Sequence, residues 1–115
     1  MTLAELRDKV LQRLGVLAAG EIASAEDAAL VEGILRGVQG ELEALNIALW
    51  TMDDVPDYAA GSMIRMALPE IGPAFGVTNI NGLPLDEAYR EMGIRRLREL
   101  TADRVPSAPG TAEYF

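Results

Sequence analysis

"YAAGSMIRMALPEI", residues 58–71, is the stretch of sequence that decides the fold of this chain. Almost every position in it is apolar or small, and Arg65 and Glu70 are the main exceptions. A helix that is apolar around most of its circumference has to be surrounded by other parts of the protein. The stretch therefore predicts the central, most buried helix, in which Met63 and Met66 are ordinary core residues.

Prolines and glycines mark the two ends of this central helix. Asp54 suits the N-cap and Pro56 the first turn, because a helix start tolerates the missing amide of proline. Near the other end, Pro69 removes an amide and predicts a kink or an interruption. The segment "GPAFG" then ends the helix close to Phe75. We predict a helix over residues 56–74.

Two further helices precede the central one. Thr2 and Glu5 have the spacing of a capping box and predict a helix over residues 3–14, which Gly15 ends in the left-handed conformation. Ser24 starts a second helix over residues 25–45, and Asn46 can cap its end. The apolar residues of this helix recur in steps of three and four and predict one core-facing seam, formed by Ala28, Val31, Leu35, Val38, Leu42 and Leu45.

Gly33, Gly37 and Gly40 lie on the opposite side of that second helix, together with Ala44. Each interior glycine costs about 1 kcal/mol of helix stability relative to alanine, so three of them in one helix are a noticeable loss. Two interpretations stay open. The glycines are either tolerated in solvent, or they let another backbone, such as that of a neighbouring subunit, pack closely on the helix.

The C-terminal third predicts one more helix and an arm. After a loop rich in Asn and Gly, Pro84 is expected to start a helix over residues 84–100, whose basic end suits the helix dipole. Residues 101–115 contain two prolines and no helical period. The expected fold is all-α: a small four-helix bundle-like domain over residues 1–100, no sheet of consequence, and an extended C-terminal arm over residues 101–115.

Composition excludes several classes of function. The 115 residues contain no cysteine and no histidine, so thiolate metal sites and the commonest general base are absent, and no cofactor or metal is expected. The net charge of −8 opposes tight binding to nucleic acid. No apolar run approaches the roughly 18 residues of a membrane span, and the charged N-terminal segment is unlike a signal peptide. We expect a cytoplasmic, non-catalytic protein.

The segment "LWTMDDVPDY", residues 49–58, carries the densest acidic cluster of the chain. Carboxylates near a helix start favour the positive end of its dipole, so we interpret Asp53, Asp54 and Asp57 as capping residues. An enzyme that uses the three with magnesium is the minor alternative, because no phosphate loop or activated nucleophile accompanies them. Trp50 is interpreted as a core residue.

The order of these features resembles the head–tail connector proteins, also called adaptor or head-completion proteins, of tailed bacteriophages and gene transfer agents. The matching pieces are "LRDKVLQRLGVLAAGEIASAEDAALVEGIL", then "IALWTMDDVPDYAAGSMIRMALPEIGPAFGV", and last the Arg-rich helix with its arm. The chain departs from the family pattern at Pro69 and Gly72, where the third helix is not expected to stay straight. The resemblance spans most of the chain and rests on pattern rather than on a catalytic motif.

The resemblance implies a virion structural protein in the neck of the particle, assembled in the cytoplasm of a host bacterium. Roughly twelve copies would form a ring beneath the portal protein, contact a downstream neck or tail protein, and let DNA pass through the channel. Gly33, Gly37 and Gly40 would lie in the subunit interface. The arm would bind the portal, with contacts from Val105, Pro106, Pro109, Tyr114 and Phe115.

Two alternatives accompany this expectation. The first is a non-viral helical interaction or regulatory module that binds one partner protein as a monomer or dimer. The arm, in turn, could fold back over its own core or stay disordered instead of reaching the portal.

Overall fold

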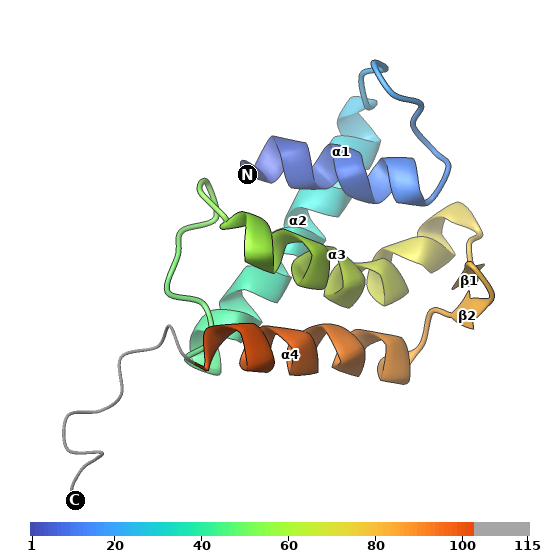
Figure 1. Ribbon diagram of the computed structural model, residues 1–115. Coiled ribbons are helices and arrows are strands. Elements are labelled where there is room, and N and C mark those ends of the chain that lie inside the picture. The colour runs from blue at the N-terminus through green and yellow to red at the C-terminus, as the bar shows by residue number, and fades with distance from the viewer. Residues whose placement is uncertain (103–115) are drawn as a thin grey trace, which may run out of the picture.

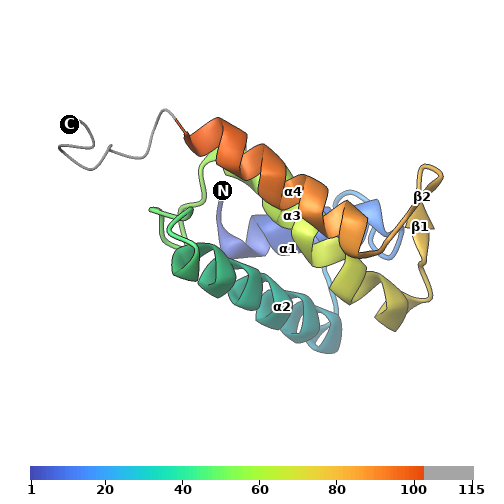
Figure 2. The ribbon, with the colours of Figure 1, turned by 90° about the horizontal axis from the view of Figure 1, so that it is seen from below.

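The computed structural model describes residues 1–102 and confirms the all-α fold class over that range. It contains four α-helices: α1 (Leu3–Arg13), α2 (Ala25–Ala44), α3 (Asp57–Ile71) and α4 (Glu87–Thr101). Figure 1 shows α3 in the middle of the molecule, with α1 above it, α4 below it and α2 crossing behind it. Seen from below, α3 again lies between α2 and α4 (Figure 2). In residues 1–102, no helix is long and apolar enough to cross a membrane.

Helix α3 is the most buried helix, as its sequence predicts. Its fully buried side chains include Met63, Met66 and Leu68, and it packs against each of the other three helices, most extensively against α4. Burial of a large apolar side chain contributes about 1.5–3 kcal/mol, so this helix supplies much of the hydrophobic stabilisation. The rest of the domain is arranged around it.

The end of α3 differs from the helix predicted over residues 56–74. The α-helix includes Pro69 but stops at Ile71, and the chain continues as the 3₁₀ helix η1 (Gly72–Phe75). Gly76 then takes a left-handed φ of 72°. Space is the physical reason for this tight ending, because a Cβ on Gly72 would lie 2.6 Å from both the Val77 carbonyl oxygen and Leu85 Cδ1.

The predicted loop after η1 is a short antiparallel hairpin of β1 (Asn79–Ile80) and β2 (Leu83–Pro84). Asn81 and Gly82 connect the strands with φ values of 52° and 80°, the positive pair that a type I′ turn requires. The prediction that Pro84 starts the last helix is wrong. Pro84 pairs with Asn79 in β2, and α4 starts at Glu87, where the Asp86 carboxylate accepts a hydrogen bond of 3.0 Å from the Tyr89 amide.

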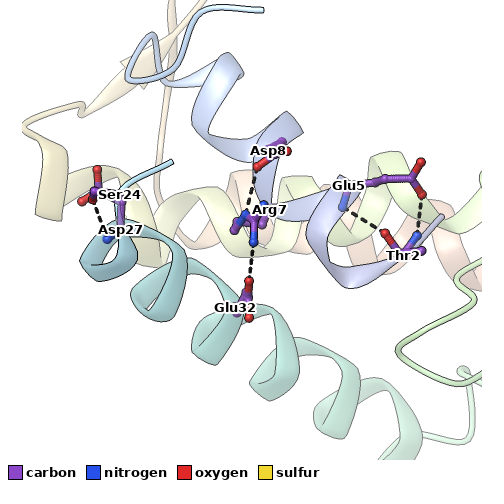
Figure 3. A network of polar contacts seen from close by, with 7 residues as sticks. All are labelled: Thr2, Glu5, Arg7, Asp8, Ser24, Asp27 and Glu32. Carbon is purple, nitrogen blue, oxygen red and sulfur yellow. Dashed lines mark hydrogen bonds and ion pairs between the residues drawn. The ribbon is translucent and has the colours of Figure 1, made fainter. Parts of the chain in front are cut away.

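Local capping signals at the first two helices are confirmed. The Thr2 amide donates to Glu5 Oε1 at 2.7 Å and the Glu5 amide donates to Thr2 Oγ1 at 3.2 Å, which completes the capping box (Figure 3). Ser24 Oγ accepts from the Asp27 amide at 3.1 Å. Gly15, after the end of α1, has a φ of 76°. Each bond satisfies an amide that the helix start otherwise leaves unpaired.

The start of α3 corrects part of the interpretation of the acidic cluster, since Asp57 lies in the first turn of α3 as the dipole argument expects, but Asp54 is not the cap. Pro56, not Asp54, occupies the N-cap position, and no side chain caps this helix. The segment is held instead by long-range contacts: the Val55 amide donates to the Met1 carbonyl at 2.9 Å, and Val55 is fully buried. Because burial of Val55 determines the direction of the adjacent side chains, Asp54 is left exposed.

Two residues near the end of α2, which the sequence placed in the core, are less buried than expected. Leu45 is the C-cap of α2 and is 41% exposed, so the core-facing seam ends at Leu42. Trp50 is half-buried rather than enclosed. Its Nε1 donates to Gln39 Oε1 at 2.8 Å, and its ring meets the edge of Tyr58, which fixes the α2–α3 connection against α2.

The predicted arm falls almost wholly outside the described residues. Thr101 is the last residue of α4 and is buried, with its hydroxyl donating to the Leu97 carbonyl at 2.7 Å. The five residues assigned to portal binding all lie beyond residue 102: Val105, Pro106, Pro109, Tyr114 and Phe115.

Candidate functional site: uncovered surfaces of the helical domain

One long side of α2 is formed by small residues and faces away from the core. Gly33, Gly37, Gly40 and Ala44 are all exposed. Apart from the helix's own backbone and adjacent residues, no described atom lies within 4 Å of a Cβ built on any of the three glycines. We call these four residues the glycine face. It leaves the α2 backbone open along most of the helix.

The opposite side of α2 carries the predicted core residues. Val31 and Leu35 are fully buried, as is Leu42. Ion pairs from the neighbouring helices fix the orientation of α2 between these sides. In the first, Arg7 on α1 reaches Glu32 on α2 at 2.6 Å, and Arg7 also contacts Asp8 of its own helix at 2.9 Å (Figure 3). The hydrogen bond to Asp8, followed by the one to Glu32, raises the pKa of the Arg7 guanidinium.

A second ion pair ties α4 to the other end of α2. Arg90 pairs with Glu41, and it also approaches Glu87 at 3.5 Å. The hydrogen bond with Glu41 raises the pKa of the Arg90 guanidinium. Because α1 and α4 each hold α2 through a charged contact, the glycine face points outward in a fixed direction.

A groove runs between α3 and α4 and reaches the end of α1, with a volume of about 660 Å³. We call it the α3/α4 groove. Its apolar or small lining includes Gly61, Met92 and Leu100, and Tyr58 lies at one end. The groove is shaped by a close helix contact: the Gly93 backbone approaches α3 so tightly that a Cβ there would lie 2.8 Å from the Ser62 carbonyl oxygen.

Positive charge predominates around this groove. Four arginines and two carboxylates line it, which leaves an excess of positive charge in a chain whose net charge is −8: Arg13, Arg65, Arg95, Arg96, Asp57 and Glu99. Arg96 approaches Glu99 at 3.4 Å, and the Arg65 guanidinium lies 5.2 Å from the centre of the Tyr89 ring. No carboxylate of residues 1–102 forms an ion pair with Arg13 or Arg95. The groove thus has both apolar surface and cations to offer a ligand.

The α1–α2 loop, residues 14–24, presents the most exposed large apolar side chain among the described residues. Ile22 is 93% exposed, and Glu21 and Asp27 line the same shallow hollow beside it. The Ala18 amide donates to Glu21 Oε1 at 2.7 Å, which holds the turn together. We call residues 18–24 the Ile22 loop.

Asp53, Asp54 and Asp57 do not form a metal site. In the part of the chain that the structure describes, no group of three or more His, Cys, Asp or Glu side chains is arranged to hold a metal ion. Asp57 lines the α3/α4 groove, whereas Asp53 and Asp54 are exposed outside its lining. The three carboxylates therefore do not line one common site.

No family model, curated protein or solved structure matches the chain. A functional proposal therefore rests on the surfaces of the domain together with the resemblance of the sequence pattern.

The sequence pointed to the glycine face but not to the groove. Gly33, Gly37 and Gly40 follow from the angular positions of residues on one helix. The groove combines Arg13 from α1, Arg65 from α3 and Arg95 from α4, which are far apart along the chain. Two signals were present: Arg65 interrupts an otherwise apolar helix, and a basic run occupies the end of α4. Taken alone, Arg65 is only an exception in an apolar helix, and the basic run suits the helix dipole, so neither signal indicates a shared groove.

Proposed function

We propose that the chain is a structural protein of the virion neck, a head–tail connector that forms a ring of roughly twelve copies beneath the portal protein. In this role it has no catalytic activity and no cofactor. It contacts a downstream neck or tail protein and lets DNA pass through the channel of the ring without binding it. Assembly takes place in the cytoplasm of the host bacterium.

The observation that supports a ring most directly is the glycine face. Three glycines within α2 lower helix stability by about 1 kcal/mol each, and no described atom of the same copy packs against their Cβ positions. A close helix contact in another subunit gives those glycines a use, because small residues let two backbones approach each other. The face is also uncharged, which suits a contact that excludes water.

The C-terminal segment supplies the second element of the proposal. Residues 103–115 carry Tyr114 and Phe115, and aromatic side chains are frequent anchors in protein interfaces. About 13 extended residues can span roughly 45 Å, which is enough to reach an adjoining ring. In the proposed role Val105, Pro106 and Pro109 accompany the two aromatics on the portal surface.

The acidity of the chain is compatible with a DNA conduit. A net charge of −8 repels phosphate, so a channel wall of this composition lets DNA slide. The arginines of the α3/α4 groove then serve contacts between proteins instead of contacts with DNA.

The glycine face is tested by a bulky substitution at its centre. Gly37→Leu is expected to leave the isolated domain folded, since the added side chain meets no described atom, and to block ring formation on a co-expressed portal protein. Ala4→Leu is the matched control, because it adds an apolar side chain at an exposed position of α1. Electron microscopy of portal complexes gives the readout, and normal rings of Gly37→Leu would assign the glycine face to solvent.

The arm is tested by deleting residues 105–115. The truncated protein is expected to keep its helical circular dichroism, because all four described helices precede the deletion, and to lose attachment to the portal protein. Truncated protein that still joins the portal with full affinity would refute the docking role of the arm.

A further inference from the structure

We infer that the α3/α4 groove of one copy receives the Ile22 loop of the next copy, so that the two surfaces form a head-to-tail contact. The inference rests on the proposed ring and names the surfaces that close it. It is carried by a loop and a groove whose shape, polarity and placement match.

The Ile22 loop has the properties of an inserting element. Ile22 is 93% exposed, so docking would remove from water a large apolar side chain that the single copy leaves in solvent. The loop is already ordered by the hydrogen bond from the Ala18 amide to the Glu21 carboxylate, so docking requires little further loss of conformational freedom. Glu21 and Asp27 place two carboxylates next to the apolar side chain.

The α3/α4 groove has the complementary properties. Gly61 lines the groove, and no described atom of another part of the fold lies within 4 Å of a Cβ built on it. This open space leaves room for a branched side chain between α3 and α4. Met92 is 38% exposed and gives the groove an adaptable apolar surface. Arg13 and Arg95 line the groove without an ion pair to any described carboxylate, and their charge is opposite to that of Glu21 in the loop and Asp27 at the start of α2.

The Ile22 loop and the α4 side of the groove lie at different ends of the molecule, as a ring contact requires. In Figure 1 the α1–α2 loop is at the end of the fold farthest from α4. Figure 2 shows α2 and α4 on opposite sides of α3. Contacts between two different surfaces of identical subunits run head to tail and close into rings when the rotation permits.

A second exposed apolar residue, Leu49, is the weaker candidate. It is 65% exposed and lies in the connection between α2 and α3, whereas Ile22 is 93% exposed. Both segments adjoin groove-lining residues along the chain, because Asp57 follows the connection and Arg13 precedes the α1–α2 loop. The greater exposure of Ile22 therefore decides between them, and Leu49 serves as the comparison position in the test.

The contact is tested by cysteine crosslinking between copies, which the absence of native cysteine makes specific. Ile22→Cys and Gly61→Cys are prepared separately as full-length proteins, both at positions where the new side chain has space. The two proteins are mixed, assembled on the portal protein and treated with a short bismaleimide. We expect crosslinked dimer in the mixture at several times the yield from either variant alone. Leu49→Cys mixed with Gly61→Cys is the matched control and is expected to stay at background.

Each other outcome overturns the inference in a distinguishable way. Rings that form normally without the mixed crosslink would refute this contact and leave the proposed function standing. Efficient crosslinking of Ile22→Cys alone would assign the loop to a two-fold contact. If Gly61→Cys crosslinks to Tyr114→Cys and not to Ile22→Cys, the C-terminal segment, and not the Ile22 loop, occupies the groove. Failure of the wild-type protein to self-associate, even with the portal protein, would overturn the ring and this contact together.

Discussion

Gly93 on α4 and Gly37 on α2 are both glycines inside a helix, but their surroundings differ. A Cβ on Gly93 would lie 2.8 Å from the Ser62 carbonyl oxygen and 3.0 Å from Met66 Cγ, so the missing side chain lets α4 approach α3. A Cβ on Gly37 would meet no atom of residues 1–102 within 4 Å beyond its own helix and neighbours. The first glycine has a use within the fold. The second one has a use only if a surface outside the described domain packs on it.

The largest effect is expected on the core side of α2, opposite the glycine face. Leu35 is fully buried, so Leu35→Ala should lower the free energy of unfolding by about 2–5 kcal/mol through lost burial and a residual cavity. Urea denaturation followed by circular dichroism gives the value. A loss no larger than the experimental error would mean that α2 is not anchored through this side.

A smaller loss is expected at the tight glycine. Gly93→Ala should destabilise the domain by about 1–3 kcal/mol, because the added methyl group has to displace the α3 backbone at Ser62. The gain in helix propensity, at most about 1 kcal/mol, offsets only part of this. The same urea experiment is the measurement, and increased stability would show that α3 and α4 do not need their close approach.

The open glycine should respond in the opposite direction. Gly37→Ala is expected to stabilise the isolated domain by about 0.5–1 kcal/mol, since alanine is the better helix former and meets no described atom there. Gly37→Ala should raise the free energy of unfolding, whereas Gly93→Ala should lower it, so the two changes are expected to have opposite signs. A destabilised Gly37→Ala would mean that this face is covered within the subunit.

The smallest effect concerns a purely local contact at the start of α1. The hydrogen bond from the Thr2 amide lowers the pKa of the Glu5 carboxyl below its ordinary value of 4.5. A carboxyl whose pKa is lowered on folding adds stability above its unfolded pKa, and loses it as the pH falls through the folded one. Glu5→Gln should therefore slightly reduce stability at neutral pH and flatten the acid side of the stability curve. Urea midpoints measured above and below pH 4.5 check this, and an unchanged acid slope would contradict it.

The sequence predicted the features that depend on residues close to one another in the chain. The capping box of Thr2 and Glu5, and the cap at Ser24, involve bonds between residues three positions apart. The burial of α3 follows from its own composition. Asp54 failed as a cap because the buried Val55 and its bond to Met1, which is distant in sequence, determine how that segment lies. Pro84 failed as a helix start because its position pairs across a hairpin with Asn79.

The sequence by itself determined an all-α chain with a central apolar helix and a strip of glycines on one side of α2, because helical periodicity fixes which residues share a side. Only the tertiary structure decided at which glycine a neighbouring helix occupies the space of the missing side chain, and at which one that space is open. It also decided that Arg13, Arg65 and Arg95 share one groove. The physical reason is that helix packing sets distances between segments far apart in the chain, and no pattern within a single helix carries that information.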